Sequence, residues 1–368
     1  MINKERLLNL FLDLVKIDSP SLKEKDVAAF LIKLMEEKGY EVKVDKAGDA
    51  CGGNTGNVFV RIPATCEGDP IAFSAHMDCV QPCIGVVPVV ENGIVRSAGE
   101  TVLGSDDKAG IAMIIEALTH LKEESIPHPE IFFMFSICEE SGMHGAKNMD
   151  TALLPAKNVV VLDSGGKVGT LVVAAPAKAG INMTFAGKSA HAGIAPEDGV
   201  SAIQIAAEAV SNMNLLRIDE CTTANLGRIE GGSVTNIVTD RATLTAEARS
   251  TNEESLNSQL KHMEKCCADA VEKVGGEYKF EYEISYPVLK VDESSPILHK
   301  VENCCKNIGI TSSRIPTGGG SDANILYGKG YSVLTLGIGM TKVHTVDEYI
   351  EVSSLTDCAN LVAEIMKG

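Results

Sequence analysis

The chain has 368 residues, and its 33 lysines and arginines against 50 aspartates and glutamates give a formal charge of −17 at pH 7. So large an excess of negative charge repels the phosphates of nucleic acids and of anionic membranes, and we therefore expect neither as a partner. With 45% hydrophobic and 23% charged residues, the composition is that of a packed globular protein, and the length suits about two domains. A solubilising coat explains the charge unless some of the carboxylates gather at one site.

Eleven cysteines are spread irregularly along the chain, with adjacent pairs at 266–267 and 304–305 and no CxxC motif. An odd number without regular spacing does not indicate a disulfide framework, so we expect reduced thiols and a reducing compartment. Residues 1–17 predict an amphipathic helix and lack the cleavage pattern of a signal peptide. No segment approaches the ~18 apolar residues of a membrane span. We therefore predict a soluble, cytoplasmic protein.

The first half of the chain alternates helical and strand patterns. After the N-terminal helix, apolar spacing predicts a second helix over about 21–38 and strands over 57–63 and 70–78. A further helix is expected over about 107–122. The short continuous apolar runs at 131–137 and 159–163 are typical of strands buried on both faces. This order favours a mostly parallel sheet covered by helices.

From about residue 175 the pattern changes to strict alternation of apolar and polar residues, over 179–187, 242–249 and 278–286. Such alternation predicts antiparallel strands with one face in solvent. Helical patterns over about 199–213 and 253–274 complete a small β-α-β-β-α-β-like layer.

After Pro287 the first pattern returns, with a helix near 296–307, a glycine-rich loop at 317–321, a strand at 331–337 and a last helix from 353. We therefore predict an α/β fold with a mixed, mostly parallel sheet flanked by helices. Residues 1–174 and 288–368 would form this domain, and residues 175–287 a smaller inserted α+β domain.

Histidine and carboxylate side chains cluster where the predicted strands end. In open α/β sheets, ligands bind outside the carboxyl ends of the strands, so such residues can converge on one crevice. The residues concerned are His76, Asp78, Asp106, Asp107, Glu139, Glu140, Asp163 and His344.

Each of these residues alone has a simpler explanation. Asp106 and Asp107 suit the N-cap of the following helix, His76 suits a hydrogen-bonded core position, and Asp163 suits a turn. The acidic pair at 139–140 is unremarkable by itself. Together, however, several carboxylates in one crevice would repel one another and raise one another's pKa, and a divalent cation removes this penalty. A metal site is therefore the more economical explanation.

The donor types narrow the choice of metal. Two histidines and several carboxylates, without cysteine, suit zinc and also allow cobalt or manganese. The ligands suffice for two ions that share one bridging carboxylate. Such a pair polarises a carbonyl oxygen and lowers the pKa of a bound water towards ~7, while a carboxylate outside the coordination shell can act as general base. This is the chemistry of metal-assisted amide hydrolysis.

Six motifs, in this order along the chain, resemble those of the co-catalytic dizinc exopeptidases, a family that includes peptidase T, glutamate carboxypeptidases and acyl-amino-acid deacylases. They are SAHMD (74–78), GSDDKAG (104–110), CEESG (138–142), LDSGG (162–166), GKSAHAG (187–193) and VHT (343–345). The second aspartate of DDKAG is most similar to the peptidase T branch. The resemblance implies a zinc exopeptidase-like fold, in which the inserted domain is a lid that often also forms a dimer surface.

The resemblance also implies roles for the clustered residues. His76, Asp106 and Asp163 would hold one zinc ion, and Asp106, Glu140 and His344 the other. Asp78 would orient His76, as carboxylates commonly do behind zinc-bound imidazoles. Glu139 would be the general base, whereas Asp107 keeps its explanation as a helix-cap residue.

In the inserted domain, His191 would polarise the scissile carbonyl or stabilise its oxyanion, in its own subunit or in that of a partner. Asn236 and Arg249 fall where family members contact substrate. Without the resemblance, His191 is better explained by a glycine-flanked turn and Arg249 by a solvent-facing strand position. The loop TGGGSDAN (317–324) lacks the lysine and spacing of phosphate loops, and the resemblance places Gly319, Gly320 and Ser321 beside the substrate carboxylate. Ser321 would also serve as a helix cap.

The resemblance therefore predicts a dizinc aminopeptidase that acts on short peptides, and tripeptides in particular, and it allows a homodimer formed through the lid. An N-acyl-amino-acid deacylase or a carboxypeptidase of the same family is the alternative, because one metal centre hydrolyses all such amides. A third hypothesis is a non-catalytic homologue that binds amino-acid-like ligands. The presence of Glu139 together with every ligand argues against this last hypothesis.

Overall fold

A computed structural model describes residues 2–368. The chain divides into two compact units. The first comprises the residues up to Val173, together with Val291–Thr317 and Ser321–Gly368, and the second comprises Ala174–Lys290 and Gly318–Gly320. The catalytic and lid roles predicted for the two parts of the chain stay predictions.

A mixed sheet forms the centre of the first unit. Its strands, in spatial order, are β1 (Glu41–Val44), β2 (Val58–Ile62), β6 (Ile131–Ser136), β3 (Ile71–His76), β7 (Asn158–Ser164), β16 (Ser332–Gly337) and β8 (Thr170–Ala175). The pairs β6–β3, β3–β7 and β7–β16 are parallel, whereas the outer pairs are antiparallel. β15 (Ser313–Pro316) also pairs with β8. Every residue of β3 and β6 is buried, as their continuous apolar sequences predicted.

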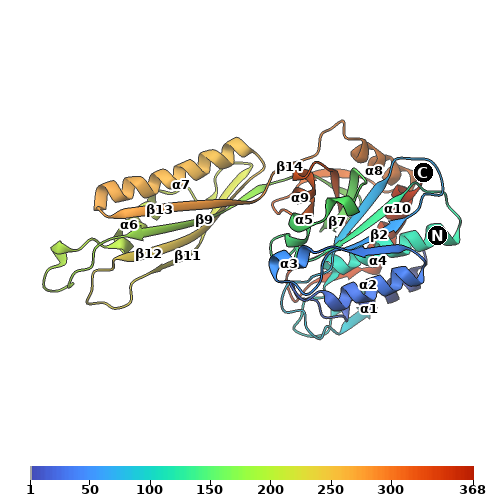
Figure 1. Ribbon diagram of the computed structural model, residues 1–368, viewed down its shortest axis with the longest axis horizontal. Coiled ribbons are helices and arrows are strands. Elements are labelled where there is room, and N and C mark those ends of the chain that lie inside the picture. Colours follow the sequence, from blue (N-terminus) through green and yellow to red (C-terminus); the bar gives the residue numbers. More distant parts are fainter. Residues whose placement is uncertain (1) are drawn as a thin grey trace. The chain divides into compact units, whose positions relative to one another are not determined.

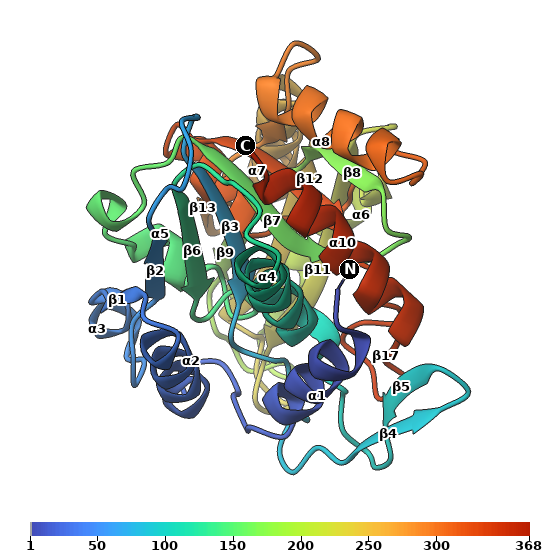
Figure 2. The ribbon, with the colours of Figure 1, turned by 90° about the vertical axis from the view of Figure 1, so that its right-hand side faces the viewer.

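Helices flank this sheet, so the predicted fold class is confirmed. α4 contacts β3 and β7, and Figure 2 shows it crossing in front of these strands. Helices α1 and α10 pack against α4, and α9 contacts β16. The helices of this unit are α1 (Lys4–Val15), α2 (Lys25–Glu37), α3 (Ala47–Cys51), α4 (Ser105–Glu123), α5 (His144–Asn148), α8 (Pro296–Asn307), α9 (Asp322–Gly328) and α10 (Val352–Met366). A 3-10 turn covers Thr151–Leu153.

One small sheet in the first unit lay outside the sequence predictions. It consists of β4 (Pro88–Glu91), β5 (Ile94–Ser97) and β17 (Tyr349–Glu351), paired in the order β17-β5-β4. These strands are three or four residues long and mostly half-exposed, so they carry too few buried positions to show a period. The sheet joins the segment before Asp106 to the segment after His344.

The second unit is an antiparallel sheet with two helices on one face, and its element order is the predicted β-α-β-β-α-β with one additional two-residue strand, β10 (Leu216–Arg217). α6 and α7 contact each other and the sheet, and Figure 1 shows α7 running along it. Burial alternates along β9, where Ile181, Met183 and Phe185 face the helices. The elements are β9 (Ala177–Ala186), α6 (Ala202–Asn212), β10 (Leu216–Arg217), β11 (Thr222–Gly231), β12 (Arg241–Ser250), α7 (Glu253–Val274) and β13 (Glu277–Tyr286), in sheet order β10-β11-β12-β9-β13. β14 (Leu289–Lys290) pairs with Ala174 and Ala175, and a 3-10 turn covers Pro196–Asp198.

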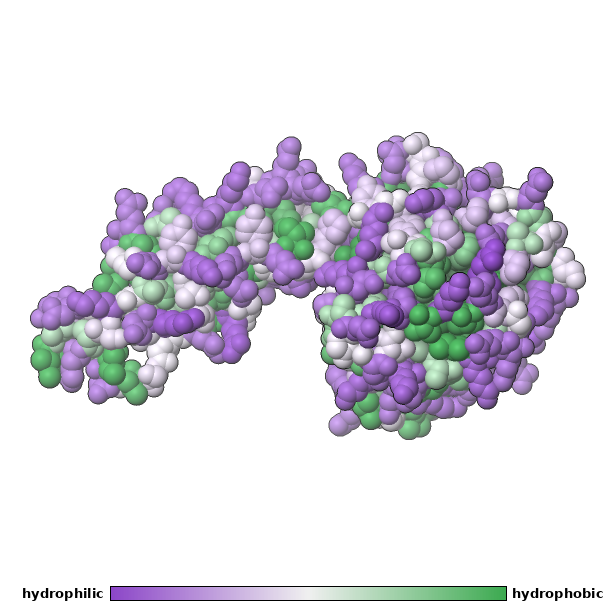
Figure 3. All heavy atoms as spheres, viewed as in Figure 1, coloured by the Kyte–Doolittle hydropathy of each residue, from purple (hydrophilic) through white to green (hydrophobic). Residues whose placement is uncertain are grey.

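Hydrophilic residues cover most of the face seen in Figure 3, with hydrophobic residues scattered among them. Across residues 2–368, no helix combines the length and the apolar character that crossing a membrane requires.

Candidate metal centre

His76 lies at the end of β3, where the central parallel strands of the first unit also end. Its ring is almost fully buried, and its Nε2 atom lies 3.1 Å from Oδ1 of Asp106 and 3.8 Å from Oδ1 of Asp163. Asp163 belongs to the neighbouring strand β7. The parallel pairing of β3 and β7 therefore brings an imidazole and a carboxylate together, as the strand-end argument predicted.

Asp106 lies between the two histidines of the cluster. Its Oδ1 atom faces His76, and its Oδ2 atom lies 3.2 Å from Nε2 of His344. The same Nε2 atom lies 2.9 Å from Oε1 of Glu140, which follows β6. The five predicted ligands thus form one continuous series of contacts, in the order Asp163, His76, Asp106, His344, Glu140.

The donor set fits divalent cations. Ligand atoms of His76, Asp106 and Glu140 all lie within 4.8 Å of one another, as do those of His76, Asp107 and Asp163. The buried Oε1 atom of Glu140 accepts no hydrogen bond from the described residues, and it forms an ion pair with Nε2 of His344. Imidazole and carboxylate donors at this density suit zinc, cobalt or manganese.

The electrostatics of the cluster also favour a bound cation. Burial raises the pKa of Asp163, and repulsion by Asp106 and Glu140 raises it further. Burial, followed by repulsion from Asp163, also raises the pKa of Glu139. A positive ion among these carboxylates would relieve both effects.

The histidines partly offset this concentration of negative charge. Burial opposes the ionisation of Asp106, but its hydrogen bonds with His344 and His76 outweigh burial and lower its pKa. The carboxylates of Asp106 and Glu140 raise the pKa of His344 to about 10. A metal ion would have to displace that proton before His344 could serve as a ligand.

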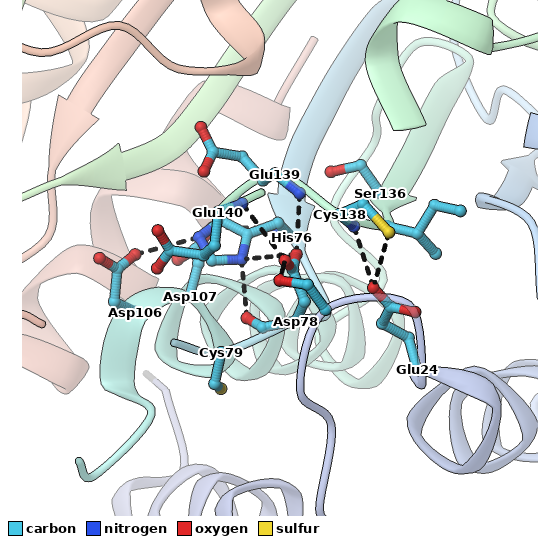
Figure 4. Close-up of polar contacts among 12 residues, drawn as sticks. Glu24, His76, Asp78, Cys79, Asp106, Asp107, Ser136, Cys138, Glu139 and Glu140 are labelled. Carbon is cyan, nitrogen blue, oxygen red and sulfur yellow. Dashed lines mark hydrogen bonds and ion pairs between the residues drawn. The ribbon is translucent and has the colours of Figure 1, made fainter. Parts of the chain in front are cut away.

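Asp78 holds the loop that carries Glu139 and Glu140. Its buried carboxylate accepts hydrogen bonds from the main-chain N–H groups of Glu139 at 3.0 Å and Glu140 at 3.2 Å, and from the hydroxyl of Ser21 at 2.6 Å. Figure 4 shows both N–H contacts and the Glu139 side chain directed away from Asp78. The Nδ1 atom of His76 lies 2.9 Å from the main-chain oxygen of Asp78 and 3.4 Å from its carboxylate. Asp78 thus contacts both the His76 ring and the loop that carries Glu139 and Glu140.

Asp107 has the geometry of a helix cap. Its Oδ1 atom accepts a hydrogen bond from the N–H group of Gly110, three residues into the regular part of α4, and its Oδ2 atom accepts one from the N–H group of His76. The carboxylate therefore satisfies the first turn of the helix and ties it to the end of β3.

The predicted substrate residues divide between the two units. Ser321 belongs to the first unit and caps α9, since its hydroxyl accepts from the N–H group of Ala323 and its own N–H group donates to the side chain of Asn324. The other predicted substrate residues belong to the second unit and are His191, Asn236, Arg249, Gly319 and Gly320.

Within the second unit, His191 and Asn236 are exposed. The Nδ1 atom of His191 accepts a hydrogen bond from the N–H group of Gly193, and the main chains of His191 and Ile237 form an isolated antiparallel β-bridge. Arg249 forms an ion pair with Glu247 at 2.8 Å and donates to the main-chain oxygen of Gly318 at 3.3 Å. The substrate roles of these residues stay predictions.

Three buried carboxylates beside the cluster were missed from the sequence. Glu24 accepts hydrogen bonds from the N–H and S–H groups of Cys138. Asp322 accepts one from the hydroxyl of Ser136, and Glu348 accepts several from the segment before α4. The only sequence signal was an acidic residue next to an apolar segment or a predicted helix end, a pattern that exposed residues share.

Comparison with known proteins assigns the family. The model of peptidase family M20/M25/M40 matches residues 72–368. The chain is 43% identical to an aminopeptidase PepT from Bacillus cereus, with a TM-score of 0.94 over 99% of this chain and 98% of that one. It is 40% identical to a tripeptidase from Staphylococcus aureus, with a TM-score of 0.96 over 100% of this chain and 98% of that one.

Two curated sequences are similar along their whole length. An uncharacterized Bacillus subtilis protein, YqjE, is 42% identical over 100% of this chain and 99% of its own length. Peptidase T from Listeria monocytogenes is 26% identical over 99% of this chain and 98% of its own length. The chain therefore belongs to peptidase family M20/M25/M40, in which it is similar to peptidase T, and it is a hydrolase of peptide bonds.

Proposed function

We propose that the chain is a metal-dependent aminopeptidase that releases the N-terminal residue of tripeptides. The observation that carries the proposal is the continuous contact of two histidines with three carboxylates at the strand ends of the first unit. Relatives named as an aminopeptidase and a tripeptidase, each at least 40% identical over nearly the whole chain, support the choice of substrate.

In this proposal two metal ions bind at the cluster. His76, Asp106 and Asp163 would hold one, and Asp106, Glu140 and His344 would hold the other, so that Asp106 would serve both. Zinc suits these donors, and cobalt or manganese could replace it. When bound, such ions supply Lewis-acid polarisation of the scissile carbonyl and a water of lowered pKa.

Glu139 acts as the general base. It takes a proton from the attacking water and returns it to the nitrogen of the leaving amine, so its charge is the same before and after turnover. Its burial, the largest cause of its raised pKa, suits this role, because a carboxylate of ordinary pKa holds a proton too weakly near neutral pH. Asp78 keeps Glu139 in place through the main-chain N–H groups of the loop.

The second unit would supply groups that bind the peptide. His191 would stabilise the oxyanion, and Asn236, Arg249 and the glycines at 319–320 would contact the substrate, with Ser321 beside them. Because Arg249 already pairs with Glu247, a substrate carboxylate would have to compete with this internal partner. A homodimer formed through this unit and a location in the cytoplasm belong to the same proposal.

A substrate screen with matched variants tests the proposal. Purified chain supplied with zinc, cobalt or manganese is offered tripeptides with a free N-terminus, dipeptides and N-acyl amino acids, and released amino acids are measured. Preferential cleavage of free tripeptides supports the proposal. Preferential cleavage of N-acyl amino acids would instead identify a deacylase, and release of the C-terminal residue a carboxypeptidase.

The variant Glu139→Gln tests the base separately from the metals. Turnover should fall by about 10²–10⁴-fold, while the number of bound metal ions stays unchanged. Glu67→Gln, on the exposed surface, is the matched control and should retain full turnover. Retained activity in Glu139→Gln would remove Glu139 from the mechanism.

A further inference from the structure

Glu348 is a buried carboxylate next to the metal centre, with only 1% of its surface exposed. Its Oε2 atom accepts hydrogen bonds from the N–H groups of Leu103 at 2.8 Å and Gly104 at 2.9 Å. Its Oε1 atom accepts from the hydroxyl of Ser105 at 2.5 Å and the N–H group of Asp106 at 3.1 Å. One side chain thus fixes four consecutive residues, of which the last is the proposed shared ligand.

The backbone of this segment is shaped for an anion. Gly104 has a φ of +76°, in the left-handed region, and a Cβ atom there would lie 3.0 Å from Sγ of Cys79. This turn directs successive N–H groups to one side, which is the geometry of a backbone anion nest. A neutral side chain in the place of Glu348 would leave several of these buried donors without a partner.

Glu348 also belongs to the loop that presents His344. The ends of this loop are joined by reciprocal main-chain hydrogen bonds between Thr341 and Tyr349, at 3.0 and 3.1 Å. Inside the loop, the N–H group of Glu348 donates to the main-chain oxygen of Thr345. His344 therefore stands four residues from Glu348 in a closed loop, with its side chain half-exposed and 3.2 Å from Asp106.

From these contacts we propose that Glu348 is a positioning residue that sets the separation of Asp106 and His344. It thereby sets the affinity of the cluster for the second metal ion, which is the ion that Asp106, Glu140 and His344 would hold. The inference rests on the proposed function, because these two residues share a metal only there. Glu348 holds Asp106 through a hydrogen bond to its main chain and His344 through the loop that both residues share. The positions of both proposed ligands therefore depend on one buried side chain. Residues that hold metal ligands in this way typically change metal affinity by about 10–100-fold when they are replaced.

Glu116, in the helix α4 that also contains Asp106, provides a matched control. It is also 1% exposed, and its carboxylate accepts hydrogen bonds from the N–H group of Asn3 and from the guanidinium of Arg6. It lies ten residues beyond Asp106 on α4, about 15 Å along the helix axis. Its replacement removes buried hydrogen bonds of similar number without touching the metal centre.

The experiment compares Glu348→Gln, Glu348→Asp and Glu116→Gln with the wild type. Cobalt and zinc binding are measured on chelator-treated protein by titration against a competing chelator, and thermal unfolding is followed with and without metal. We expect Glu348→Gln to lose about 10–100-fold in affinity for the second ion. Glu348→Asp should lose less, because it keeps the charge, and Glu116→Gln should melt at a lower temperature with unchanged metal affinity.

Ser105→Ala provides a second test that leaves the carboxylate in place, in case Glu348→Gln does not fold. Removing one of the four donors should reduce affinity for the second ion about fivefold. Wild-type affinity for both ions in folded Glu348→Gln, or in Ser105→Ala, would refute the positioning role while leaving the proposed function intact. An equal loss of affinity in Glu116→Gln would also refute it, since the effect would then reflect general stability. A wild-type chain that binds no metal would refute the proposed function and this inference together.

Discussion

Replacement of Asp78 by asparagine tests whether its carboxylate holds the Glu139–Glu140 loop. The carboxylate accepts two main-chain N–H groups and one hydroxyl while it is fully buried. Asparagine offers one oxygen, so at least one of the two N–H groups would face an NH2 group. A hydrogen bond to a buried charged group contributes about 1.5–3 kcal/mol, and a buried unpaired donor adds a penalty of similar size. We therefore expect Asp78→Asn to lower the free energy of unfolding by about 2–4 kcal/mol.

The matched control is Ser21→Ala, which removes the hydroxyl donor and leaves both N–H contacts in place. It should cost about 1.5 kcal/mol, the low end of the range for a hydrogen bond to a charged group, because this hydrogen bond is only partly buried. Urea unfolding of both variants after chelation gives the stabilities, and tripeptide turnover with metal gives kcat. In Asp78→Asn a displaced loop should also lower kcat about 10²-fold. A stability loss no larger than that of Ser21→Ala, or a folded Asp78→Asn with nearly wild-type kcat, would show that the carboxylate does not hold the loop.

Four further measurements test other parts of the structure. Burial raises the pKa of Asp322 from 3.8 to about 6, so this carboxyl stabilises the fold below about pH 4 and loses that contribution as the pH rises through 6. The stability of Asp322→Asn relative to wild type should therefore rise by up to about 3 kcal/mol across this range in chelator-treated protein, and a difference independent of pH would contradict the assignment. Phe185→Ala in the buried face of β9 should reduce the stability of the second unit by about 3–5 kcal/mol in urea, whereas a loss below about 1 kcal/mol would mean that this core is loosely packed. Of the 11 cysteines, only Cys51, Cys66 and Cys221 are partly exposed, so a thiol reagent should label at most three quickly before denaturation, and fast labelling of more would contradict the burial. Removal of metal by a chelator should lower the melting temperature and abolish turnover, with both restored by zinc, cobalt or manganese, and turnover that survives complete removal would refute the metal requirement.

The sequence by itself determined the fold class and brought the clustered residues to the right edge of the sheet. Continuous apolar runs such as 131–137 favour strands buried on both faces, and period-two alternation such as 179–187 favours a sheet with one exposed face. The alternation over 278–286 predicted a buried face that β13 lacks, because this strand lies at the edge of its sheet and leaves Tyr278, Tyr282 and Ile284 exposed. Both patterns are local, because they depend on the repeat of the backbone and on which side chains avoid water. Since parallel strands end at one edge, the positions of His76 and Asp163 followed from the strand assignments alone.

Only the tertiary structure decided how the cluster is supported. Asp78 was expected to orient His76, and its carboxylate does lie 3.4 Å from Nδ1 of His76, but it also accepts hydrogen bonds from the backbone of the Glu139–Glu140 loop, which the sequence did not indicate. Glu348 contacts Asp106 across 242 positions of the chain, and Glu24 contacts Cys138 across 114. These carboxylates bind main-chain N–H groups, which every residue except proline carries, so no residue type on the other side marks the contact. Partners of this kind are selected by backbone conformation in space, which exists only once the chain has folded.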